Sequence, residues 1–100
     1  MYFGTIAHYR VKPGHEDALM AEMKTFETSP PPGWIYTTVF RAAEGADELW
    51  MSTVFESEEA YRRNADSPAM GERFQAMRQH LAADPEWHDG HVIHEAMRQG

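Results

Sequence analysis

The stretch that most constrains the fold covers residues 47–74 and combines a strand pattern with two capped helices. Residues 48–56 (ELWMSTVFE) are rich in β-branched and aromatic side chains, which favour a strand. Ser57 can accept a hydrogen bond from a free backbone N–H at a helix start, and the acidic pair after it suits a first turn. Ser67 followed by Pro68 then predicts an interruption and a new helix, because serine caps well and proline is tolerated in the first turn.

Three further segments have the composition of strands: residues 2–11, 34–41 and 87–96. Side chains alternate along a strand, so the first segment should direct one set of them toward the helices. That set is expected to be Phe3, Thr5, Ala7, Tyr9 and Val11. Alternation in the second segment puts four residues on one face: Trp34, Tyr36, Thr38 and Phe40. In the last segment, Gly90 predicts a bulge or a close approach of another backbone.

Two helical stripes complete the pattern. Leu19, Met23 and Phe26 recur at i, i+4 and i+7, which predicts a helix over residues 14–27. The second stripe consists of Met70, Phe74, Met77 and Leu81. The order is β-α-β-β-α-β with the second helix broken, as in a ferredoxin-like split βαβ domain, and we expect one α+β domain over residues 1–100. Its four-stranded antiparallel sheet would carry helices on one face only.

The other face of that sheet should carry Ile6, Trp50 and similar bulky side chains, too apolar to remain in water. A second copy of the chain would cover it, so we expect a homodimer. His8, Arg10 and Trp50 fall on this face and are the residues expected to meet the partner. A buried Arg10 would need an acidic neighbour.

Charge and hydropathy restrict the other partners. The formal net charge of -7 disfavours nucleic acid, whose binding depends on basic side chains, and no basic tract suits an anionic membrane. No segment approaches the ~20 apolar residues that span a bilayer, and the N-terminus does not resemble a signal peptide, so we expect a cytoplasmic location. Cysteine is absent, which excludes disulfides and thiolate ligands.

Three sequence motifs resemble the antibiotic biosynthesis monooxygenase family: VKPGHED after the first strand, VFESEEAYRRNADSPAMGERF after the third, and WHDGHVI in the last. The resemblance covers roughly residues 2–96 and implies a dimeric α+β barrel with a pocket between sheet and helices in each subunit. The superfamily includes cofactor-free quinone-forming oxygenases, haem-degrading oxygenases, cyclases, isomerases and many proteins with no assigned role.

The residues that carry haem chemistry in such relatives are replaced here. The resemblance puts the roles of a strand asparagine, a helix tryptophan and a haem-ligating histidine at Ala7, Asn64 and Phe74. Phenylalanine cannot ligate iron, so haem degradation is not expected. Other relatives show an H-x-x-S-P-H pattern, which residues 64–69 (NADSPA) match only in the Ser-Pro pair.

The resemblance gives two candidate catalytic residues. The Asn64 amide could hold a substrate carbonyl or phenolate, or it could instead satisfy backbone groups at the helix break. Tyr9 could orient a hydroxylated ring and exchange a proton, or it could be a core tyrosine. Four residues are candidates for substrate binding, although such spacing is also typical of plain core: Ala7, Phe55, Phe74 and Met77.

The histidines do not predict a metal site. His91 should point away from His88 and His94, and the latter two would lie about 20 Å apart on a regular strand. His15 and His80 fall within the expected helices and are expected to be solvated.

The hypothesis that follows is an oxygenase that needs no metal, flavin or other cofactor and acts on a small aromatic or quinol-type compound. An electron-rich substrate anion can reduce O₂ itself, so the protein mainly has to stabilise that anion and exclude water. Two alternatives remain. One is a non-catalytic dimeric small-ligand-binding or stress protein of the same fold, and the other is haem binding without degradation.

Overall fold

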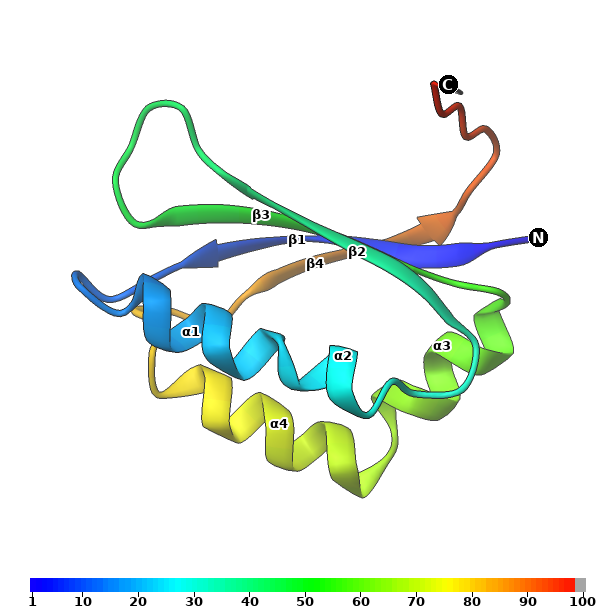
Figure 1. Cartoon of the computed structure of the whole chain (residues 1–100), viewed down its shortest axis with the longest axis horizontal. Coiled ribbons are helices and arrows are strands. Elements are labelled where there is room, and N and C mark those ends of the chain that lie inside the picture. The colour runs from blue at the N-terminus through cyan, green and yellow to red at the C-terminus, as the bar shows by residue number, and fades with distance from the viewer. Residues whose placement is uncertain (99–100) are drawn as a thin grey trace.

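The molecule is built on a four-stranded antiparallel sheet with helices on one face (Figure 1). The computed structural model describes residues 1–98. Its elements are β1 (Phe3–Arg10), α1 (Glu16–Met23), α2 (Thr25–Thr28), β2 (Trp34–Arg41), β3 (Glu48–Phe55), α3 (Glu58–Ala65), α4 (Pro68–Arg78) and β4 (Glu86–His91). The strand order β2-β3-β1-β4 confirms the expected α+β ferredoxin-like fold with a broken second helix.

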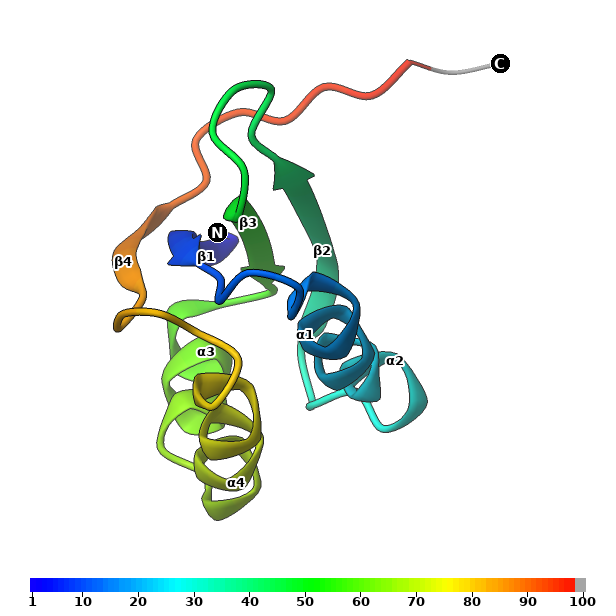
Figure 2. The same ribbon diagram turned by 90° about the vertical axis from the view of Figure 1, so that its left-hand side faces the viewer.

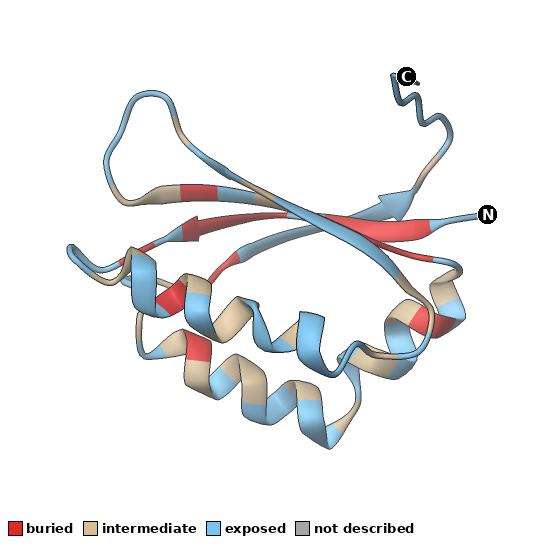
Figure 3. Ribbon diagram, in the orientation of Figure 1, coloured by how far each residue is buried: buried red, intermediate tan, exposed pale blue. Residues whose placement is uncertain are grey.

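The core lies between β1 and the helices. The expected alternation along β1 is confirmed, since Phe3, Thr5, Ala7 and Tyr9 are buried whereas Ile6 and Arg10 are exposed. In Figure 3 most of this strand has the colour of buried residues. Seven buried apolar residues form the main cluster: Ala7, Tyr9, Val11, Leu19, Leu49, Met77 and Leu81. Gly4 is also required on this strand, because a Cβ there would lie 2.0 Å from the Thr53 carbonyl oxygen.

Both serine caps are confirmed. The Ser57 hydroxyl accepts a hydrogen bond from the Ala60 amide at 3.1 Å, and α3 follows. The Ser67 hydroxyl accepts from the Met70 amide at 3.1 Å and donates to the Asn64 carbonyl at 2.7 Å. Ser67 therefore begins α4 and also ties it to the end of α3.

Three expected boundaries differ from the structure. The helix predicted over residues 14–27 is interrupted at Lys24, which separates α1 from α2. The stripe that ends at Leu81 outlasts its helix, because α4 ends at Arg78 and a turn follows. The last strand ends at His91 rather than at residue 96. It pairs only with β1, whose first residue faces His91, so the chain beyond has no strand to join.

Two expectations are wrong: the face on which Trp34 lies and the role of Gly90. The pairing of β2 with β3 slips between Trp34 and Tyr36, where one extra residue forms a bulge. The bulge turns Trp34 to the helix-facing side, away from Tyr36 and Phe40. Gly90 forms neither a bulge nor a close approach to another backbone. It pairs in regular register with Gly4, and a Cβ added to it would meet no atom within 4 Å.

The open face of the sheet is apolar and exposed. Ile6, Phe40 and Trp50 expose 53%, 60% and 40% of their surface. His8 is only 8% exposed, because its ring stacks on Trp50 at 4.3 Å and its Nδ1 lies 3.1 Å from the Glu86 carboxylate. The chain itself therefore covers His8, whereas Arg10 and Trp50 stay accessible.

Candidate functional site

A cavity of about 860 Å³ lies between the helix-facing side of the sheet and the helices. In Figure 2, α1 and α2 lie to one side below the sheet and α3 and α4 lie to the other, and residues from both sides line the cavity. Its walls are mainly aromatic and methionine side chains, among them Met20, Met23, Phe26, Trp34, Met51, Phe55, Met70, Phe74, Met77 and Trp87. Such a lining favours a flat, largely apolar ligand.

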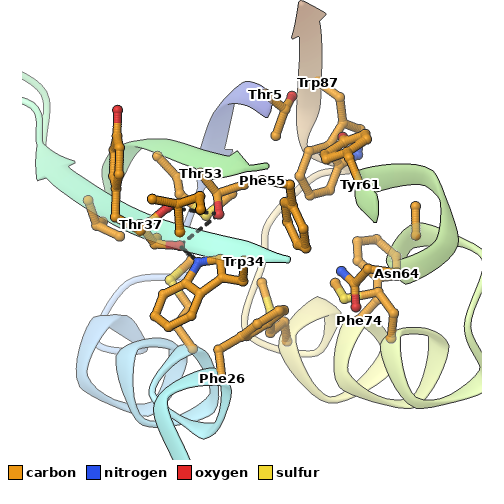
Figure 4. A pocket seen from close by; sticks show the side chains of 18 of the residues that line it. Thr5, Phe26, Trp34, Thr37, Thr53, Phe55, Tyr61, Asn64, Phe74 and Trp87 are labelled. Carbon is orange, nitrogen blue, oxygen red and sulfur yellow. Dashed lines mark hydrogen bonds between the residues drawn. The ribbon is translucent and has the colours of Figure 1, made fainter. Parts of the chain in front are cut away.

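Asn64 supplies an amide without an internal partner. The side chain is half-buried on α3 and makes no hydrogen bond to any residue from 1 to 98, whereas the backbone carbonyl accepts from Ser67. Figure 4 shows the amide directed toward the cavity. The helix break is thus held by Ser67 and the backbone of Asn64, and the amide remains available to a ligand.

Tyr9 lies at the floor of the cavity. Its hydroxyl donates to the Met51 sulfur at 3.6 Å, a weak acceptor that a ligand oxygen could replace. Burial raises the pKa of Tyr9 well above its usual value, with a smaller contribution from Tyr61. The phenol therefore stays neutral and can donate a hydrogen bond, but it is a poor source of a basic phenolate.

A second polar group lines the wall formed by α3. The Tyr61 hydroxyl donates to Asp89 of β4 at 2.9 Å. Burial, followed by the bond to Asp89, raises the pKa of Tyr61 to about 12. The buried Thr5 hydroxyl acts weakly in the opposite direction but makes no well-formed hydrogen bond. Tyr61 and Asn64 are three residues apart on α3 and so share one side of the helix.

Trp34 adds an indole to the wall next to the sheet. Its Nε1 donates to the Thr37 hydroxyl at 2.9 Å, and that hydroxyl lies 2.7 Å from the Thr53 hydroxyl (Figure 4). These polar atoms satisfy one another, which leaves the indole as a flat apolar surface.

Five of the six candidates from the sequence line this one cavity: Tyr9, Phe55, Asn64, Phe74 and Met77. Ala7 is not among the lining residues; it packs in the core cluster beside Tyr9.

Sequence reasoning missed Tyr61, Asp89, Trp34 and Trp87. The three-residue spacing to Asn64 could have indicated Tyr61. No pattern in the sequence marks the bulge that reorients Trp34.

Histidine is absent from the cavity wall. All six histidines lie within residues 1–98, and none lines the cavity. The phenylalanine at the position that the resemblance gives to an iron ligand, Phe74, is a wall residue beside Trp87. Within the same described part, no three His, Cys, Asp or Glu side chains could share a metal ion. No helix there is long and apolar enough to cross a membrane.

Known structures share this fold over nearly their whole length. A protein of Chloroflexus aurantiacus J-10-fl, provisionally named an antibiotic biosynthesis monooxygenase, is 26% identical, with a TM-score of 0.79 and coverage of 97% of this chain and 98% of that one. A conserved protein of Methanosarcina mazei Go1 is 22% identical, with a TM-score of 0.79 and coverage of 91% and 92%.

SnoaB of Streptomyces nogalater is a cofactor-independent oxygenase, solved as a variant with an asparagine replaced by alanine. It is 17% identical, with a TM-score of 0.78 and coverage of 94% of this chain and 95% of that one. No match was found among curated proteins. The family model for antibiotic biosynthesis monooxygenases matches residues 2–91, nearly the whole sequence. The expected resemblance is thereby confirmed, and the chain belongs to the antibiotic biosynthesis monooxygenase family.

Proposed function

We propose that this protein is a cofactor-independent oxygenase that acts on a small, planar aromatic compound of the phenol or quinol type. The observation that carries the proposal is the aromatic-walled cavity of about 860 Å³ into which a hydrogen-bonding amide, Asn64, projects without an internal partner. The likeness to SnoaB, which is described as a cofactor-independent oxygenase, supports the same reaction class.

In this reaction the substrate is ionised and its anion reduces O₂. At an activated methylene, one oxygen atom becomes the new carbonyl and the other leaves as water with the two hydrogens of the methylene. The Asn64 N–H would stabilise the oxyanion that forms on ionisation, inside a cavity where such a bond is strong. Tyr9, neutral because of its raised pKa, would donate a second hydrogen bond after releasing the Met51 sulfur.

The test is O₂ consumption by the purified protein with anthrone as the substrate. Asn64→Ala should lower the rate more than tenfold, because a single donor to a developing oxyanion contributes at least that much. Gln75→Ala is the matched control, since this amide is exposed on α4 and does not line the cavity.

An unchanged rate for Asn64→Ala would remove Asn64 from the mechanism. Saturable binding of anthrone without any O₂ uptake would overturn the oxygenase proposal and favour the non-catalytic ligand-binding alternative.

We also infer that two copies pair through the open face of the sheet. Ile6, Phe40 and Trp50 together present an exposed apolar surface on neighbouring strands, the kind of patch that marks an interface. Arg10 lies at the edge of this face and would be drawn into the contact.

A further inference from the structure

Two histidines join the start of α1 to the end of α4, outside the cavity. His15 precedes α1, His80 follows α4, and the Nδ1 atoms of their rings lie 3.1 Å apart. Both residues are half-buried rather than solvated as the sequence suggested. We propose that this pair is a binding site for a divalent transition-metal ion.

The pair is held in place by the backbone on both sides. The His15 amide donates to the Lys12 carbonyl at 3.0 Å, and the Lys12 amide donates to the His80 carbonyl at 2.9 Å. Directly after His80, Leu81 pairs with Val11 in a β-bridge and is fully buried. The backbones of the two histidines are therefore held next to each other by one short loop, which keeps both imidazoles within reach of a single ion.

The spacing suits an ion held by both rings. Two nitrogens 3.1 Å apart, each at the ~2.1 Å typical of zinc, subtend about 95° at the metal. That angle lies between the right angle of octahedral coordination and the wider tetrahedral angle. In the metal-free pair one Nδ1 must donate a proton to the other. With an ion bound, both would offer a lone pair and carry their proton on Nε2.

Charges of both signs surround the pair. The carboxyl end of α4, which carries partial negative charge, lies beside His80, and Arg78 in the same last turn is paired with Asp84. At the start of α1 the opposite partial charge is offset by Glu16 and Asp17 in the first turn. The Glu16 carboxylate is already paired with Arg41, so it is a neighbour rather than a ligand.

The protein supplies only two ligands to this site, so the ion would be weakly held and exchangeable. No third His, Cys, Asp or Glu completes a group anywhere in residues 1–98, so water fills the other positions. Imidazole suits copper, nickel and zinc. The site would thus hold an exchangeable ion. By linking α1 to α4, it would also fix two helices whose side chains line the cavity.

The experiment uses the untagged full chain, stripped with a chelator and titrated with Ni²⁺. Calorimetry should show that one ion binds per chain. The Tm should rise by several degrees with Ni²⁺ and return to the metal-free value when chelator is added. His80→Gln and His15→Asn should each abolish the rise, whereas His94→Gln, in the exposed tail, should keep it. For each variant, the Tm with Ni²⁺ is compared with the Tm of the same variant without Ni²⁺. A change in the basal stability of the variant therefore does not affect the result.

A second readout identifies the ligands directly. The electron paramagnetic resonance spectrum of the Cu²⁺-loaded chain should show coupling to two ring nitrogens, reduced to one in His80→Gln. Equal nickel-induced shifts in the parent chain and His80→Gln, or a copper spectrum without two coupled nitrogens, would overturn the proposal. Neither readout depends on oxygenase activity.

Discussion

At the scale of single residues, two of the tyrosine hydroxyls that line the cavity, those of Tyr9 and Tyr61, stay protonated well beyond neutral pH. Tyr9 and Tyr61 have raised pKa values for the same main reason, burial in the cavity wall. A neutral phenol can donate to a substrate oxygen but does not repel a substrate anion. Together with the Asn64 amide, these hydroxyls are neutral donors in a wall whose carboxylates are Glu27 and Asp89.

The raised pKa of Tyr61 makes stability depend on alkaline pH. Its pKa is about 12 in the folded chain and about 10 when unfolded, so its contribution is complete below pH 10 and is lost as pH rises toward 12. The free energy of unfolding in urea should fall less between pH 8 and pH 11 for Tyr61→Phe than for the parent chain. Equal losses would mean that Tyr61 ionises as freely in the folded protein as in the unfolded one.

Gly33 should be the less replaceable of two glycines with similar backbone angles. Gly33 and Gly14 have φ values of 85° and 81°, so alanine at either costs about 1–2 kcal/mol in strain. At Gly33 the new Cβ would also lie 2.7 Å from the Ala60 Cβ, whereas at Gly14 it meets nothing within 4 Å.

The free energy of unfolding in urea should therefore fall further for Gly33→Ala than for Gly14→Ala, by about 1 kcal/mol or more. Equal values for the two variants would show that α3 shifts to relieve the contact.

At the scale of elements, the Ser67 cap joins the start of α4 to Asn64, the α3 residue whose amide projects into the cavity. Ser67→Ala should lower the free energy of unfolding by about 1 kcal/mol, as loss of a cap usually does, and Ser57→Ala should cost a similar amount. Only the first change also removes a hydroxyl bond to the Asn64 carbonyl, which keeps its bond from the Ser67 backbone amide. Ser67→Ala should thus reduce anthrone turnover as well, whereas Ser57→Ala should leave it unchanged. Equal turnover in the two variants would show that the Ser67 bonds at the helix break do not contribute to catalysis.

The order of elements could be predicted because each carries a local signal. Serine caps, the Ser-Pro pair and the Met70–Leu81 stripe depend only on neighbours in sequence, and they predict α3 and the start of α4 correctly. The early end of β4 depends on the strand alongside it, so no local pattern could show it.

The same distinction holds for the site. Phe55, Phe74 and Met77 follow from strand and helix periodicity, and Asn64 from the family resemblance. Trp34 could not be assigned, because one unpaired residue in β2 reverses the alternation that places it. The small side chain of Ala7 predicts space for a ligand beside it, but the core fills that space.

At the scale of the whole molecule, the apolar sheet face should determine the oligomeric state. Phe40→Glu and Ile6→Glu would each bury a charge in the proposed contact, so light scattering after gel filtration should show a monomer. Ile93→Glu is the control, since Ile93 is 89% exposed in the C-terminal tail. A monomeric parent chain, or a Phe40→Glu protein of unchanged mass, would contradict the sheet-to-sheet pairing.

The bulge in β2 also bears on how this cavity can change during evolution. A single inserted or deleted residue at this point exchanges the side chain offered to the ligand, while the pairing from Tyr36 to Arg41 keeps its register. Gain or loss of one codon could thus alter ligand preference in one step.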